Sequence, residues 1–147
     1  MPEIVSPRLR RLYEYWDQKR GSKAMPSRAD IDPVDMAFAL GNVILAEVLP
    51  ETPPRFRIRL HGTTLVQYAG YDLTGKMLDD MPLPEFRELA RQSFSKVAKE
   101  RKPLHVAAER IIDERMRRYE TILMPLSGDG DRVDMLLIGM IYADERR

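Results

Sequence analysis

Hydrophobic residues recur along the chain with two different periods, which predict where helices and strands form. Between positions 9 and 16 the apolar residues lie three or four positions apart, which predicts a helix over residues 7–20. The same spacing predicts a longer helix over residues 84–101. Short helical segments are expected at residues 32–40, which open with Asp-Pro, and at residues 62–70, which are bracketed by glycines.

A period of two marks the strands. Residues 55–61 alternate apolar residues with three arginines and a histidine, which predicts a strand with one buried face. Further strands are predicted at residues 43–49, 104–112, 118–125 and 132–142. Five strands, split two and three around a helical middle, favour an α+β fold in which helices pack on one face of an antiparallel sheet.

The segment 135–140 is apolar at positions that point to both faces of its strand, which indicates that both faces are covered. The helical middle covers one face, so we expect the N-terminal helix to cover the other, either within the chain or across a dimer. Residues 1–21 are therefore interpreted as an N-terminal helix, and residues 22–147 as a single domain. The hypothesis is that this helix mediates homodimerisation. The candidate interface residues are Leu9, Leu12, Tyr13 and Trp16.

Composition narrows the functional classes. The formal net charge of +1 gives no overall field for nucleic acid, and we expect none to bind. The absence of cysteine excludes disulfides, thiolate metal sites and cysteine nucleophiles. The longest apolar run, residues 135–143, is too short to cross a bilayer, and the N-terminus does not read as a secretory signal, so we expect a cytoplasmic protein without membrane contact.

Motifs that would carry chemistry are incomplete. Residues 70–77 resemble a phosphate-binding loop, but Met77 stands where Ser or Thr would hold Mg²⁺. The acidic residues at 129–134 resemble a weak calcium loop and are better interpreted as a turn. His61 is expected to face outward, in register with the arginines, whereas His105 opens a strand and could line a pocket. No metal site and no catalytic residue are predicted.

Four separated motifs carry a resemblance to a known family. They are residues 12–16 (LYEYW), 25–33 (MPSRADIDP), 55–63 (RFRIRLHGT) and 70–75 (GYDLTG). In this order they resemble the PAS domain, and in particular a PAS-like family common as short standalone proteins in alphaproteobacteria. The resemblance implies a PAS-like five-stranded antiparallel sheet. It also implies binding of small molecules or protein partners, often by dimers.

A pocket is expected between the helical middle and the inner face of the sheet, mostly apolar with a few polar anchors. Strand alternation supplies most of the candidate wall residues, and Phe38 and His105 are added as further candidates. The candidates are Phe56, Ile58, Leu60, Tyr68, Leu78, Met124, Phe38 and His105.

Three functions stay open on these observations. The first is a sensory module that binds a small, apolar ligand and changes its contacts with a signalling partner. The second is a ligand-free adaptor with a filled core, docking on a histidine kinase or a regulator. The third and weaker one is a small α+β enzyme, which an ionisable group inside the cavity would favour. No effector segment is recognisable after residue 142, so we expect any output to pass through another protein; no cofactor is assigned.

Overall fold

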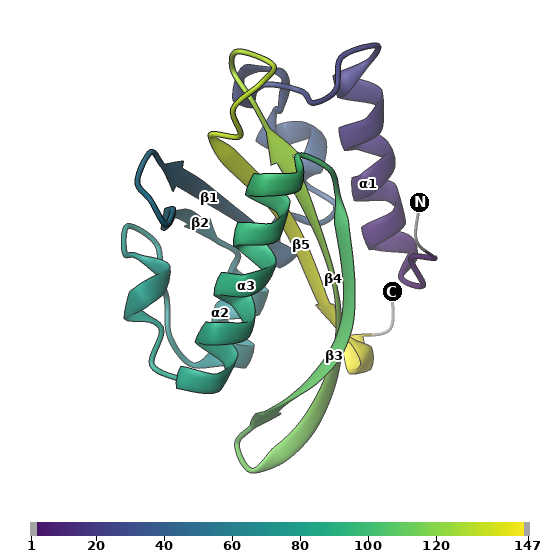
Figure 1. Ribbon diagram of the computed structural model, residues 1–147. Helices are drawn as coiled ribbons and strands as arrows, with labels where there is room; N and C mark the ends of the chain where they lie inside the picture. Colours follow the sequence, from purple (N-terminus) through teal and green to yellow (C-terminus); the bar gives the residue numbers. More distant parts are fainter. Residues whose placement is uncertain (1–2, 146–147) are drawn as a thin grey trace.

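Five antiparallel strands form one sheet in the order β2-β1-β5-β4-β3 (Figure 1). The computed structural model describes residues 3–145, so the outermost ends of the predicted ranges, residues 1–2 and 146–147, lie outside the described residues. The strands are β1 (Val43–Leu49), β2 (Arg55–His61), β3 (Leu104–Ile112), β4 (Arg115–Leu126) and β5 (Met135–Tyr142). The predicted α+β class and the five-stranded antiparallel sheet are confirmed.

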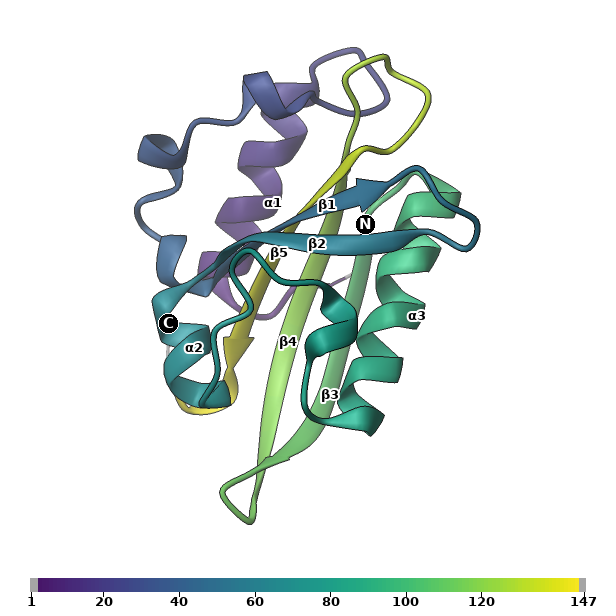
Figure 2. The same ribbon diagram turned by 90° about the vertical axis from the view of Figure 1, so that its left-hand side faces the viewer.

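Helices cover both faces of the sheet. The helices α2 (Thr63–Ala69) and α3 (Pro84–Glu100) lie over the face that we call the inner face, and α1 (Pro7–Arg20) packs on the opposite, outer face (Figures 1 and 2). Since successive side chains of a strand point to opposite faces, each strand contributes to both layers. This arrangement explains why β5, in the middle of the sheet, is buried along almost its whole length.

The N-terminal helix packs on the sheet of its own chain. Ser6 caps it, its Oγ accepting a hydrogen bond from the backbone N–H of Leu9 at 3.2 Å. Leu9 and Leu12 are fully buried and lie directly over Gly139 of β5, where a side chain would collide with both. Trp16 is 2% exposed and donates its indole N–H to the carbonyl oxygen of Pro125 at 2.9 Å. Three of the four residues proposed for a dimer interface are thus committed to the intrachain core.

A buried carboxylate ties the start of α1 to the outer face. Glu120 of β4 accepts hydrogen bonds from the backbone N–H groups of Val5 and Ser6, at 2.6 and 2.8 Å. His105 of β3 lies 2.6 Å from the same carboxylate. Burial raises the pKa of Glu120, but the bonds from Val5, His105 and Ser6 outweigh it, so the pKa is lowered on balance.

Local turn chemistry moves three of the predicted boundaries. Residues 32–40 form a short 3-10 turn at Pro33–Met36 rather than a continuous helix. Asp113 and Glu114 both have positive φ and make a tight hairpin turn, so β4 begins three residues earlier than predicted. Asp129 accepts the backbone N–H groups of Asp131 and Arg132 in a turn, and β5 begins only at Met135.

Candidate functional site

A cavity of about 80 Å³ lies between the inner face of the sheet and the helices α2 and α3. Its walls are mostly apolar and come from all five strands, from both helices and from the segment that joins them. The apolar wall includes Ile44, Ile58, Leu65, Leu73, Leu78, Met81, Phe86, Leu89, Phe94, Val106, Leu123, Ile138 and Met140. Ligand sites in proteins combine such walls with a few polar groups that fix orientation, so the polar residues here decide what the cavity does.

The most unusual wall residue is Arg110 of β3, which is only 8% exposed. Its guanidinium carbon lies 3.7 Å from the ring centroid of Phe86, and its Nη1 donates to the hydroxyl of Tyr142 at 3.2 Å. Its Nε and Nη2 are buried and have no hydrogen-bond partner among residues 3–145. Because buried charges are nearly always paired with an opposite charge, an unpaired guanidinium in an apolar cavity points to function.

The surroundings of Arg110 are positive rather than neutralising. Its cross-strand neighbour is Arg117 of β4. The carboxylate of Asp144 is bound to Arg117, whose Nη1 lies 2.6 Å from Asp144 Oδ2. No ion pair joins Arg110 to any carboxylate of the described residues. The cavity therefore carries an uncompensated positive charge at the β3–β4 side.

Tyr119 and Tyr142 line this part of the cavity together with Tyr71, and Tyr68 flanks it. Tyr142 packs against Tyr119, with ring centroids 6.0 Å apart, and Tyr119 meets Phe86 edge-on at 5.9 Å. Burial raises the pKa of both tyrosine hydroxyls, and the charge of Arg110 opposes this. Tyr68 of α2 stacks on the far side of Tyr142 at 4.1 Å, outside the cavity.

A β-bulge brings His61 into the cavity, contrary to the expectation that it faces outward. In β2, Ile58 pairs with Ala46, but Leu60 pairs with Leu45, so Arg59 is an extra residue without a partner. A bulge reverses the alternation beyond it. His61 is consequently 9% exposed on the inner face, while Leu60 turns to the outer face and does not line the cavity.

His61 is held as a neutral side chain. Its Nδ1 accepts a hydrogen bond from the backbone N–H of Leu73 at 3.1 Å, which places the ring proton on Nε2. Burial lowers the pKa of His61; the carboxylate of Asp72, 4.0 Å away, opposes this, and the charge of Arg110 adds to it. His61 and His105 lie on opposite faces of the sheet, so they cannot share one site.

Of the eight residues predicted for the pocket, Ile58 and Leu78 line the cavity. Phe56 is buried behind the wall, where its ring meets Phe94 edge-on at 5.3 Å. Met124 and His105 point to the outer face, as does Leu60 after the bulge. The parity of β4 explains this, because Leu123 lines the cavity and its neighbour Met124 must point away.

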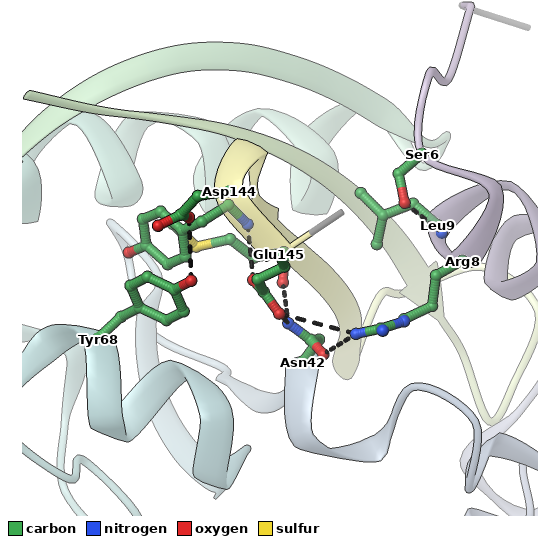
Figure 3. Close-up of polar contacts among 9 residues, drawn as sticks. Ser6, Arg8, Leu9, Asn42, Tyr68, Asp144 and Glu145 are labelled. Carbon is green, nitrogen blue, oxygen red and sulfur yellow. Dashed lines mark hydrogen bonds and ion pairs between the residues drawn. The ribbon is translucent and has the colours of Figure 1, made fainter. Parts of the chain in front are cut away.

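Tyr68 and Phe38 lie away from the cavity, where Tyr68 makes a hydrogen bond and Phe38 a cation–π contact. The hydroxyl of Tyr68 donates to Asp144 Oδ1 at 3.0 Å, beside the network that joins Glu145 to Asn42 (Figure 3). Phe38 lies under the guanidinium of Arg11 from α1, 4.0 Å from its ring centroid. Both contacts depend on segments distant in sequence, so strand alternation alone does not predict them.

Sequence reasoning missed Arg110, although a signal for it exists. In β3 every second residue is apolar at Leu104, Val106, Ala108 and Ile112, and Arg110 interrupts this row. An arginine in register with buried positions of a strand is a candidate functional residue, because burying an unpaired charge is costly.

A second hollow lies on the outer face beside β1 and β2. It is larger, about 700 Å³, and open to solvent. Two of its charged residues, Glu47 and Arg59, lie 3.9 Å apart, and no orphaned buried polar atom of the described residues lines it. The smaller inner cavity, with its unpaired charge, is therefore the candidate site.

Within residues 3–145, no group of three or more histidine, aspartate or glutamate side chains is arranged to hold a metal ion. No helix in that range is both long and apolar enough to span a membrane.

Comparison with known proteins places this geometry in a family. Among solved structures, the PAS domain of BvgS from Bordetella pertussis superposes with a TM-score of 0.59 at 16% identity, covering 79% of this chain and 90% of that one. A LOV protein from Rhodobacter sphaeroides gives 0.53 at 16% identity, with coverages of 79% and 70%. A sensory box sensor histidine kinase from Vibrio cholerae gives 0.52 at 12% identity, with coverages of 76% and 90%.

These structures share the fold at low sequence identity, and none of the curated proteins matches the sequence. The family model described as PAS domain, by contrast, matches residues 4–142, including the N-terminal helix and every strand. The fold and the sequence thus agree, and this chain belongs to the PAS domain family.

Proposed function

We propose that this chain is a sensory module that binds a small molecule in the inner cavity and transmits its occupancy to a signalling partner. The observation that carries the proposal is the cavity itself, which combines apolar walls with buried polar groups, among them an arginine with unpaired donors. A core built only for stability would avoid such a residue. A ligand that binds only the folded state would also stabilise it by mass action.

The sheet offers a route from the cavity to the outer surface. Ile138 of β5 lines the cavity, and the next residue, Gly139, lies under Leu9 and Leu12 of α1. A shift of β5 upon ligand binding would therefore reach α1 directly, because the packed side chains leave no free space between the two layers. On this proposal, the partner recognises the position of α1 or of the sheet edge.

A binding role fits the site better than catalysis. Arginine stays protonated and cannot act as a base. Burial raises the pKa of the wall hydroxyls of Tyr119 and Tyr142, and His61 uses its Nδ1 to accept the backbone N–H of Leu73. No hydrogen bond of the described residues joins His61 to a serine or threonine hydroxyl, so the cavity lacks the nucleophile–base pair of covalent catalysis.

The test compares native with denaturing mass spectrometry on freshly purified protein, together with its visible spectrum. A reproducible extra mass that is lost upon denaturation supports the sensory role. Ala90→Leu fills the cavity from α3 and is expected to abolish the extra mass, whereas Gln92→Leu on the exposed side of the same helix should retain it. Equal retention by both variants would show that the molecule binds elsewhere.

A second candidate function, a ligand-free adaptor, is favoured by an exposed apolar pair. Ile111 and Met116 face each other across the β3–β4 hairpin and are 62% and 59% exposed. The hairpin extends beyond the rest of the sheet (Figure 1). Exposed apolar residues that lie together are typical of protein contacts. Homodimerisation remains a prediction. If this pair supports it, light scattering should give a smaller mass for the Ile111→Ser/Met116→Ser variant than for the unmodified chain.

A further inference from the structure

The unpaired atoms of Arg110 identify the chemistry of a ligand. Nη1 donates to the hydroxyl of Tyr142, whereas Nε and Nη2 have no hydrogen-bond partner in the part of the chain that the structure describes. These two nitrogens lie on the same edge of the planar guanidinium, and their N–H bonds run parallel. That edge matches the two oxygens of a carboxylate, which it binds through two parallel hydrogen bonds.

That edge is closed to solvent in the ligand-free chain, because both nitrogens are buried, so a ligand reaches it from the cavity after a small shift of the surrounding side chains. Phe86 covers one face of the group at 3.7 Å, so a ligand meets it in the plane rather than from that face. Only 8% of Arg110 is exposed, and the residue lines the cavity. A carboxylate bound there would lie in an apolar, water-poor environment, where charge-assisted hydrogen bonds are strong.

Charges from neighbouring elements favour an anion. The residue opposite Arg110 is Arg117, and like charges in a cross-strand pair repel each other. Asp144 compensates Arg117 alone, at 2.6 Å. His61, also in the wall, is kept neutral, so Arg110 is the cation that the described wall offers to an anion.

The same walls limit the charge and the size of the anion. One guanidinium neutralises one negative charge, and His61 is held neutral, so the described wall offers no second cation; this disfavours phosphate and dicarboxylates. A cavity of 150 Å³ holds a benzene-sized molecule, so about 80 Å³, roughly half of that volume, accommodates a chain of about three carbon atoms.

We propose that the cavity binds a short-chain monocarboxylate, with Arg110 holding the carboxylate through Nε and Nη2 and the apolar wall holding the chain. This inference rests on the proposed function, because it names the ligand class for the same cavity. Tyr142 positions the guanidinium by accepting from Nη1 and is a positioning residue.

The experiment titrates the full chain, freed of bound molecules by unfolding and refolding, with acetate, propanoate and butanoate by isothermal calorimetry. Propanamide and propanol serve as neutral analogues of similar size. Saturable binding of the acids, at least tenfold tighter than of the analogues, is expected. In a ¹⁵N spectrum, the Nε–H signal of Arg110 should shift with the same dissociation constant.

Two variants complete the test. Arg110→Gln is expected to weaken acid binding at least tenfold, while Arg118→Gln, on the exposed outer side of β4, should leave it unchanged. Removing an unpaired buried charge should not destabilise the ligand-free fold strongly. If Arg110→Gln nevertheless fails to fold, the comparison of acids with neutral analogues on the unmodified chain still tests the proposal.

The outcomes separate the two proposals. Equal binding of acids and neutral analogues, or acid binding unchanged in Arg110→Gln, overturns the carboxylate inference and leaves the cavity a ligand site. Binding of the neutral analogues alone does the same. No binding of any compound, with no retained mass in the native spectrum, overturns both.

Discussion

Enlarging a residue of β5 while shortening one of α1 should show how tightly the N-terminal helix packs on the sheet. Gly139 lies under α1, and a Cβ at this position would lie 2.6 Å from Leu12 Cδ2 and 2.8 Å from Leu9 Cδ2. Both leucines are fully buried, so neither can turn into solvent. Gly139→Val should therefore destabilise the protein, although valine favours strands by up to about 1 kcal/mol.

The magnitudes follow from the packing. Overpacking a core costs about 1–3 kcal/mol, so Gly139→Val is expected to lower the free energy of unfolding by about 1–2 kcal/mol after the gain in strand preference. Leu12→Ala alone should lower it by about 3–4 kcal/mol, because it leaves a cavity in a fully buried site. In the double variant the valine enters that space, so the combined loss should be smaller than the sum by about 2 kcal/mol.

Urea unfolding followed by Trp16 fluorescence measures this coupling. Trp16 is the only tryptophan, and it lies in α1 with its indole bonded to Pro125. Far-UV circular dichroism on the same samples checks that unfolding is two-state. The control is Leu12→Ala combined with Ile112→Val, because Ile112 belongs to a separate hydrophobic cluster and the two losses should add. Additivity of Gly139→Val and Leu12→Ala within about 0.5 kcal/mol would refute the packing described here.

Three further predictions concern groups whose environment is now defined. Glu120→Gln should lower the stability at pH 7 by about 2 kcal/mol, because it weakens charge-assisted bonds at the start of α1. The pKa of Glu120 in the folded chain is lowered, so its carboxylate stabilises the fold above the usual pKa of 4.5, and this stabilisation is lost as the pH falls through the folded-state pKa. This pH-dependent part of the stability should be absent in Glu120→Gln. The pKa of His61 in the folded chain is lowered from its usual value of 6.5, so as the pH falls the unfolded chain binds a proton before the folded chain does. The melting temperature should therefore fall between pH 7 and 5.5, and it should fall less in His61→Asn. Gly62→Ala should cost more than about 3 kcal/mol, because its Cβ meets the backbone oxygens of Gly41 and of Leu40, the latter at 2.8 Å.

The controls use the same chain. Gly70→Ala, at a left-handed position with a φ of 84° and open space around it, should cost only about 1 kcal/mol, and a loss equal to that of Gly62→Ala would contradict the steric argument. A loss of stability in acid that is identical in the Glu120→Gln variant and the unmodified chain would assign that loss to other carboxylates.

Periodicity predicted most elements because it is a local property of the chain. The spacing of Leu9, Leu12 and Trp16 predicts a helix with one apolar face, and the alternation in residues 55–61 predicts a strand, both of which are confirmed. The residues of the cavity were predicted less well. The alternation in β2 holds up to Ile58 and is reversed after Arg59, because the bulge depends on pairing with β1 rather than on the residues of β2.

By itself, the sequence determined the elements, the class of the sheet and the family, since each depends on local patterns or on motifs read in order. Only the tertiary structure decided which partner covers α1 and which face of the sheet each side chain meets. It also decided that no carboxylate within residues 3–145 forms an ion pair with Arg110. The physical reason is that strand pairing, bulges and charge neutralisation join residues that are distant in sequence. Arg110 meets Tyr142 and faces Arg117 only after β3, β4 and β5 have come together.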